Sequence, residues 1–218
     1  TSTARWVAPY ADCRRIVPLS NSWLLSRASR TVLAFEPIRG LHDRLLAALP
    51  PNCEVFRLAA SSRDHECVLR IPRIDGRLRP SLATVSERNS FDGSGALDDV
   101  IHESANAVAL DSLLTSRAYA GRRVGFIKID VEGHEHDVLL GAATTIDSHR
   151  PTVLVETEFR HHGPVAEVFR FFDRRGYRAR SLVGGMLLPM DEVALATLQS
   201  QAALAEKIRR PHSSAYVN

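Results

Sequence analysis

The chain has 218 residues, about one and a half times the usual domain length, so one large domain is the first expectation. Hydrophobic residues make up 44% of the chain and charged residues 24%, which excludes a disordered or fibrous protein. The 28 basic and 25 acidic side chains leave a net charge of only +3, and the arginine pairs are dispersed along the chain. We therefore expect no nucleic-acid partner, because such proteins need a clustered basic face.

The cysteine content and the lengths of the apolar runs indicate in which cell compartment the protein is found. Cys13, Cys53 and Cys67 are too few and too scattered for a disulfide framework or a zinc site, which favours reducing conditions. No apolar run approaches the ~18 residues of a membrane span, and charged residues interrupt the segment 1–15, which excludes a signal peptide. We expect a cytoplasmic protein without a membrane span. Because the sequence does not begin with methionine, we also expect a fragment or a processed chain.

In the first half of the chain, short apolar runs alternate with helical patterns, which is typical of an α/β sheet. Residues 31–35 read as a buried strand, and leucines at helical spacing predict a helix over 41–49. Further strands are expected over 54–59 and 67–71. The polar stretch 73–104 reads as one long loop with a short strand near 81–85, and loops of that length are usually functional or mobile.

The second half of the chain continues the same alternation. Asp111 is expected to cap a short helix that carries Leu113 and Leu114. The later elements are two strands over 124–129 and 152–156, three helices over 135–146, 165–172 and 194–208, and a closing hairpin over 177–188. Strand followed by helix, several times over, predicts a mostly parallel sheet with an antiparallel end.

Acidic residues follow several of the predicted strands. In open parallel sheets, ligands bind at the carboxyl ends of the strands. The residues at these ends are Glu36, Ala60 with Ser61, Asp130 with Glu132, and Glu156 with Glu158. Glu36 stands where a carboxylate typically binds a ribose diol. Any one of these carboxylates could instead be a helix cap or a surface charge, but their common edge favours a site for a hydroxylated or cationic ligand.

The densest chemical stretch runs from the strand near residue 126 into the following helix. Gly133 would allow the sharp turn between the two, and Glu135 would also suit the positive end of the helix dipole. His134 and His136 are two residues apart and do not share a helix face. We therefore expect no metal ion, and a single oxygen-rich divalent site stays open as the alternative.

The segment 126–141, FIKIDVEGHEHDVLLG, resembles the signature of the FkbM-type methyltransferase family. Other pieces that are similar to the family follow in its order: LAFEP at 33–37, AAS at 59–61, ALDSLL at 109–114, RPTVLVE at 150–156, RGY at 175–177 and GMLLP at 185–189. The resemblance covers about 23–189, and several motifs in order make it more specific than a single motif would be.

The resemblance implies a Rossmann-like methyltransferase sheet, mostly parallel with an antiparallel last strand and helices on both faces. It further implies S-adenosyl-L-methionine as the cofactor and O-methylation of a hydroxyl on a small substrate, a sugar or a secondary metabolite. The whole chain would then be a single methyltransferase domain, with 190–218 as a C-terminal helix and tail.

One part of the family pattern differs in this chain. The family's first strand runs into a glycine-rich loop beside the methionine part of the cofactor, yet no glycine precedes Gly40. Counting back from Glu36 places the strand at 16–19 and the loop at 20–22. Small polar residues there can cap a helix but lack the conformational freedom of glycine. Residues 1–22 are expected to hold either a weakened loop or a truncated one.

The resemblance also assigns roles to individual residues. Glu36 would hold the ribose hydroxyls, and Asp130 would face the amino group or the sulfonium. The expected cofactor-binding residues are Ser20, Asn21, Glu36, Ala60, Ser61 and Asp130. The candidates for the general base that removes the hydroxyl proton are His134, Glu132 and His161.

Two other classes of protein stay open. A non-catalytic binding module that kept the sheet and lost the cofactor loop would explain the missing glycines, but the retained strand-end acids argue against it. An arginine-dependent nucleic-acid binder would need one basic face, which the dispersed pairs do not indicate. The sequence does not specify the methyl acceptor or the oligomeric state.

Overall fold

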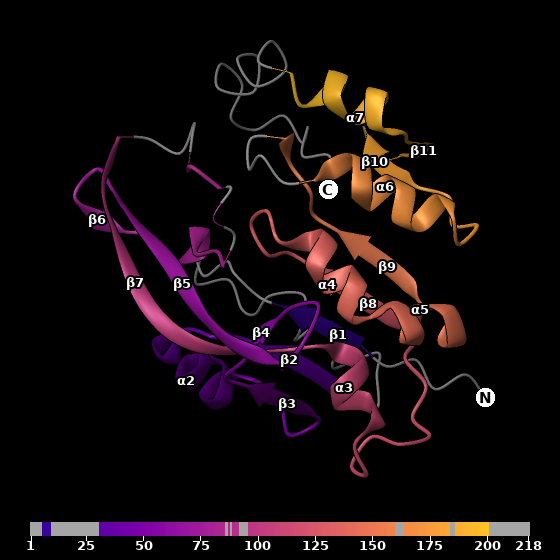
Figure 1. Ribbon diagram of the computed structural model, residues 1–218, viewed down its shortest axis with the longest axis horizontal. Coiled ribbons are helices and arrows are strands. Elements are labelled where there is room, and N and C mark those ends of the chain that lie inside the picture. Colours follow the sequence, from indigo (N-terminus) through magenta and orange to yellow (C-terminus); the bar gives the residue numbers. More distant parts are fainter. Residues whose placement is uncertain are drawn as a thin grey trace.

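The described strands are divided among three separate sheets, and helices pack against them (Figure 1). This computed structural model describes residues 31–85, 87, 89–91, 96–159, 164–181 and 186–200, and the backbone of 6–9 and 182–183. The strands are β1 Trp6–Pro9, β2 Val32–Phe35, β3 Cys53–Phe56, β4 Ala59–Ala60, β5 His65–Ile74, β6 Arg77–Leu78, β7 Leu97–Val108, β8 Phe126–Ile129, β9 Thr152–Val155, β10 Arg180–Val183 and β11 Met186–Pro189. The helices are α2 Arg39–Ala48, the 3-10 turn η1 Pro80–Leu82, α3 Leu110–Thr115, α4 Glu135–Gly141, α5 Ala143–His149, α6 Val165–Asp173 and α7 Glu192–Leu198. The mixed α/β class is confirmed.

The main sheet has five parallel strands in the order β3-β2-β1-β8-β9. Its central position, between β2 and β8, is taken by β1. The prediction that residues 16–19 fill this place was therefore wrong; that segment lies outside the described residues. The error came from counting back from Glu36 with the spacing expected for the family. The segment that separates β1 from β2 is longer than this spacing assumed.

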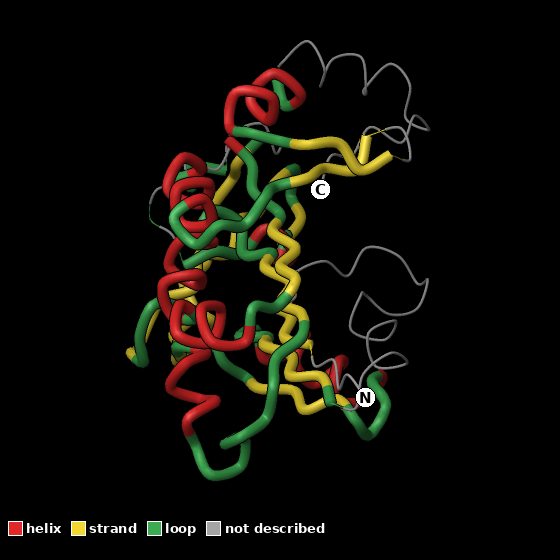
Figure 2. The backbone as a smooth tube through the Cα atoms, turned by 90° about the vertical axis from the view of Figure 1, so that its right-hand side faces the viewer, coloured by secondary structure: helices red, strands yellow, loops and turns green. Residues whose placement is uncertain are grey.

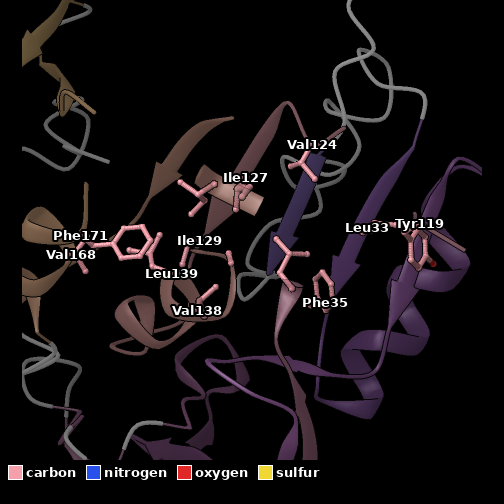
Figure 3. Packing of buried hydrophobic residues seen from close by; sticks show 13 residues of the cluster. Leu33, Phe35, Tyr119, Val124, Ile127, Ile129, Val138, Leu139, Val168 and Phe171 are labelled. Carbon is pink, nitrogen blue, oxygen red and sulfur yellow. The ribbon is translucent and has the colours of Figure 1, made fainter. Parts of the chain in front are cut away.

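Both faces of the main sheet are covered. Leu33 and Phe35 of β2 join a cluster of buried side chains with residues of β8, α3, α4 and α6 (Figure 3). These helices lie together along one side of the sheet (Figure 2). Successive strand residues point to opposite faces, so the buried Val32 points away from this cluster. The helix α2 lies on that other side, and its buried leucines are outside the cluster.

The second sheet, in the order β4-β7-β5-β6, corrects the expectation of a long loop over 73–104. Its centre is the antiparallel pair of β5 and β7, which extends as an arm beyond the main sheet (Figure 1). The sequence conceals β7 because most of its side chains are exposed, including polar ones. The alternation that marks a half-buried strand is therefore weak. The strand predicted near 81–85 is a 3-10 turn and a single bridge between Thr84 and Arg70.

The closing hairpin was predicted correctly. β10 and β11 pair antiparallel from Arg180 with Pro189 to Val183 with Met186. Among the described residues, however, this hairpin forms a sheet of its own and has no ladder with β9. The expected single sheet with an antiparallel last strand is therefore observed as a parallel sheet and a separate hairpin.

The helix expected over 135–146 is two helices, α4 and α5, which meet at Ala142. Asp111 does not cap α3 as predicted, because the N-cap there is Ala109. Its carboxylate instead accepts hydrogen bonds from the backbone N–H groups of Thr144 and Thr145, at 2.8 and 2.9 Å, in the first turn of α5. Asp111 thus joins α3 to α5. In the described part of the chain, no helix has the length and apolar character needed to cross a membrane.

Candidate functional site

A pocket lies where β2, β4 and β8 end, on the side of their carboxyl ends, and β5 and η1 form its opposite wall. The empty space at this place, which includes the solvent in its open mouth, is about 480 Å³. The lining residues are Phe35, Glu36, Pro37, Ile38, Leu58, Ala59, Ala60, Leu69, Pro80, Ala83, Thr84, Val85, Asp130, Val131 and His134. Most of this lining is apolar, and Glu36, Asp130 and His134 are its titratable members.

Glu36 directly follows β2 and is almost completely buried, with 1% of its surface exposed. Its Oε1 atom accepts a hydrogen bond of 2.8 Å from the backbone N–H of Ile38. Its Oε2 atom is buried and has no hydrogen-bond partner among the described residues. Burial raises the pKa of this carboxyl group to about 8, the bond from Ile38 opposes the rise, and the nearby Glu103 adds to it. An unsatisfied buried oxygen is costly, so this atom points to a hydrogen-bond donor on a ligand.

The turn after β8 is held in an unusual backbone conformation. Glu132 and Gly133 both have positive φ, at 51° and 96°. Only glycine adopts this region without steric cost, so Gly133 performs the role predicted for it and Glu132 is strained. The N–H of Gly133 donates to Oε1 of the buried Glu135 at 2.8 Å. This bond fixes the turn that places Asp130 and His134 beside the pocket.

His134 is hydrogen-bonded at one ring nitrogen and lies near a carboxylate at the other. Its Nε2 is 3.0 Å from Ser61 Oγ, and its Nδ1 is 3.5 Å from a carboxylate oxygen of Asp137. Burial lowers the pKa of His134, the carboxylate of Asp137 opposes this effect, and His65 adds to it. The ring is therefore neutral near neutral pH, and the Asp137 carboxylate favours the tautomer with the proton on Nδ1. Nε2 then accepts from the Ser61 hydroxyl.

The last glycine of the 126–141 segment brings α4 against the end of β4. A Cβ atom on Gly141 would lie 2.0 Å from the backbone oxygen of Ser61 and 3.2 Å from the Cα of Ser62. Only glycine allows the two backbones to approach this closely. Gly141 thus sets the position of Ser61, and through the Ser61 hydroxyl that of His134.

Three charged side chains lie together at the ends of β8 and β9. The ammonium Nζ of Lys128, which is buried, is 2.8 Å from Asp130 Oδ2 and 3.9 Å from Glu156 Oε2. Burial, and then the charge of Asp130, raise the pKa of Glu156 to about 7, while Lys128 opposes the rise. Lys128 therefore supplies the cation that holds two carboxylates close together.

Asn89 connects the wall opposite the sheet to the turn after β8. This side chain is buried, and its Nδ2 donates to the backbone oxygen of Glu132 at 2.8 Å. Its Oδ1 accepts from the N–H of Phe91, and its backbone oxygen accepts from Arg70 Nη1, both at 2.9 Å. Asn89 therefore links the β5 side of the pocket with the Glu132 turn.

The structure brings most of the predicted site residues together. Glu36, Ala60, Asp130 and His134 all line the pocket, and Ser61 lies within hydrogen-bond distance of His134. Glu132 is in the adjoining turn but is not one of the lining residues. The other three predicted residues, Ser20, Asn21 and His161, lie outside the described residues.

Sequence reasoning missed Lys128 and Asn89. The sequence of β8 could have indicated Lys128. Side chains two residues apart in a strand lie on the same face of the sheet, so Lys128 is expected beside Asp130. No sequence signal marked Asn89, whose contacts span distant parts of the chain. Within the described ranges, no three His, Cys, Asp or Glu side chains are grouped so as to hold a metal ion.

An apolar pocket with a few acidic groups at strand ends is the arrangement of α/β proteins that bind small, nucleotide-like ligands. The methyltransferase FkbM domain matches residues 20–179, and the chain belongs to this family of methyltransferases. The resemblance noted from the sequence is thus confirmed.

The crystal structure of methyltransferase FkbM from Methylobacillus flagellatus KT is similar at 15% sequence identity and a TM-score of 0.46, over 83% of this chain and 40% of that one. The chain therefore spans well under half the length of that protein. None of the curated proteins matches the sequence.

Proposed function

We propose that the protein is an S-adenosyl-L-methionine-dependent methyltransferase that methylates a hydroxyl group of a small molecule. The observation that carries the proposal is the buried, unpartnered Oε2 of Glu36 in the pocket at the strand ends, in a chain of the FkbM family. The lining also fits the cofactor chemically, since it offers apolar walls for a base and carboxylates for hydroxyl donors and positive charge.

Three parts of the lining would hold the cofactor. Glu36 would accept hydrogen bonds from the ribose hydroxyls, of which Oε2 has room for at least one. Ala60, with Leu69 and Ala83 of the same lining, would flank the adenine ring with apolar groups. Asp130 would face the cationic amino group or the sulfonium. Lys128 keeps the Asp130 carboxylate in place through its 2.8 Å contact.

The cofactor, when bound, supplies an electrophilic methyl group. The contribution of the protein is then alignment of the acceptor hydroxyl in line with that methyl, which supplies much of the rate of such displacements. A general base must also take the hydroxyl proton. Of the predicted candidates, His134 lies in the pocket, and its pKa is lowered by burial, so it is neutral and able to accept a proton.

His134 must exchange its Ser61 contact for the acceptor hydroxyl to act as this base, because Nε2 already lies 3.0 Å from Ser61 Oγ. Glu132 and His161 stay in the proposal as alternative bases. Neither Cys53 nor Cys67 forms a disulfide with another described residue, which agrees with the cytoplasm as the proposed compartment.

Calorimetric titration with S-adenosylhomocysteine tests the proposal. We expect saturable binding to the parent chain, and a loss of about 1.5–3 kcal/mol in Glu36→Ala, from the removal of a charged hydrogen bond. Glu158→Ala, a change of the same type outside the pocket lining, serves as the control. Unchanged affinity in a folded Glu36→Ala variant would contradict the ribose role.

The non-catalytic binding module, suggested by the absence of glycine before Gly40, is the alternative, which the match to a methyltransferase family does not favour. The two candidate functions differ in whether the protein transfers the methyl group or only binds the cofactor. Radiolabelled S-adenosylmethionine incubated with a panel of sugars and phenolic metabolites should yield a methylated product if the chain is an enzyme. Tight binding of the cofactor without transfer to any acceptor would favour the binding module.

A further inference from the structure

We propose that cofactor binding in this pocket is coupled to the release of one proton from Glu36. The carboxyl group is neutral in the ligand-free protein and ionised when ribose hydroxyls donate hydrogen bonds to it. This inference rests on the proposed function, and it adds a pH dependence to the binding step.

The surroundings of Glu36 disfavour a negative charge in the ligand-free state. The side chain is 1% exposed, and one of its two oxygens has no donor among the described residues. An ionised carboxylate with a single backbone hydrogen bond is costly to bury, and such a group binds a proton instead.

The charged groups around Glu36 act in the same direction. Glu103 of β7 adds negative charge, and Asp130, after β8, is the other carboxylate of the lining. His134, also in the lining, is neutral because burial lowers its pKa. The described lining residues include no lysine or arginine that would stabilise an anion at Glu36. Consistent with this geometry, burial raises the pKa of Glu36 to about 8.

A vicinal diol reverses this preference. Its two hydroxyl groups donate hydrogen bonds, which favour the charged form of a carboxylate and lower its pKa. On binding, the O–H bond of the Glu36 carboxyl group breaks and its proton passes to the buffer, while the ribose hydroxyls keep their own protons. With a free pKa of about 8, about 0.9 proton is released at a pH of about 7 when the bound pKa is well below that pH.

The experiment is calorimetric titration at about pH 7 in phosphate, imidazole and Tris buffers, which differ in ionisation enthalpy. The probes are S-adenosylhomocysteine and 5′-methylthioadenosine, the second of which has a ribose diol and no titratable amino-acid group. We expect the apparent enthalpy to change linearly with buffer enthalpy, with a slope near one released proton for both probes. The affinity should rise about tenfold per pH unit below a pH of about 8.

Glu36→Gln is the matched variant, because it keeps the size of the side chain and removes the titration. It should bind with no proton release and no pH dependence in this range. Infrared difference spectroscopy of the parent provides a second measurement, in which the carbonyl stretch of a protonated carboxyl group should disappear when 5′-methylthioadenosine is added.

The outcomes separate this inference from the proposed function. Failure of the parent to bind either probe would overturn both. Binding with no proton uptake or release, and no infrared change, would overturn the coupling alone. Proton release that persists in Glu36→Gln would show that another group is responsible, which also overturns the assignment to Glu36.

Discussion

At the scale of single residues, the pocket depends on side chains whose hydrogen-bonding capacity is only partly used within the protein. Glu36 has one oxygen bonded to the Ile38 N–H and one without a partner among the described residues. Asp130, which also lines the pocket, accepts a hydrogen bond from Lys128. The difference explains why burial shifts the pKa of Glu36 so far upward, because the only hydrogen bond to its carboxylate from a described residue comes from the Ile38 N–H.

This burial gives a pH dependence to the stability of the ligand-free protein. The folded chain keeps the Glu36 proton between the ordinary pKa of 4.5 and about 8, while the unfolded chain releases it, so the free energy of unfolding falls as the pH rises through this window. Glutamine does not titrate, so the free energy of unfolding of Glu36→Gln should not fall in this way. At about pH 8 the variant should be more stable than the parent by an amount on the order of a few kcal/mol.

Urea unfolding of both proteins between about pH 5 and pH 9 checks this prediction. The stability difference should be small at the acidic end, grow with pH and level off above about pH 8. A difference that is constant across the range would contradict a neutral Glu36 in the folded chain.

Gly141 gives a second prediction at this scale. The Cβ atom of Gly141→Ala would lie 2.0 Å from the Ser61 backbone oxygen, so either α4 or the segment after β4 must move. We expect a loss of about 1–3 kcal/mol in the free energy of unfolding, together with weaker binding of S-adenosylhomocysteine, because Ser61 would shift beneath His134.

Gly40→Ala is the matched control, since a Cβ atom at Gly40 in α2 has nothing within 4 Å. Alanine is also the better helix former there, by up to about 1 kcal/mol, so this variant should be as stable as the parent or more so. Equal effects of the two substitutions would show that close packing of Gly141 is not the cause.

At the scale of elements, the sequence predicted what local patterns determine. Buried runs such as Val32–Phe35 identified the main strands, and the glycine pair after residue 183 identified the closing hairpin. The strand predicted over 67–71 lies within β5, but β7 was missed, because its pairing with β5, and not its own pattern, makes it a strand. Residues at strand ends were likewise found, whereas Asn89 was not, because its contact with Glu132 spans 43 residues of sequence.

Asp111 supplies the prediction for this scale. Its carboxylate accepts from two backbone N–H groups and the Thr145 hydroxyl at the start of α5. Asp111→Ala removes a cap from α5 and its tie to α3, and should cost about 1–2 kcal/mol of stability, as lost N-caps do. Asp43→Ala, at an exposed ion pair in α2, should change the stability by less than about 0.5 kcal/mol. Similar losses in thermal unfolding of the two variants would contradict the capping role.

At the scale of the whole molecule, the pocket lies between two of the three sheets. The main sheet contributes the strand ends with Glu36 and Asp130, and the second sheet contributes β4 and the wall from Leu69 to Val85. Neither sheet forms the pocket alone. The prediction of one Rossmann-like sheet could therefore locate the strand ends with Glu36 and Asp130. It could not locate the part of the pocket wall that the second sheet contributes.

The last prediction concerns the cation at the edge of the main sheet. The Lys128 ammonium lies 2.8 Å from Asp130 and 3.9 Å from Glu156, the position from which a divalent ion would bridge these carboxylates. Since the protein supplies this positive charge itself, EDTA or added magnesium should change the affinity for S-adenosylhomocysteine and the melting temperature by less than the error of measurement. Lys128→Met should lose several kcal/mol of stability, because it leaves two neighbouring carboxylates without their cation. A drop in affinity in EDTA that magnesium restores would show that a metal ion, rather than Lys128 alone, organises this edge.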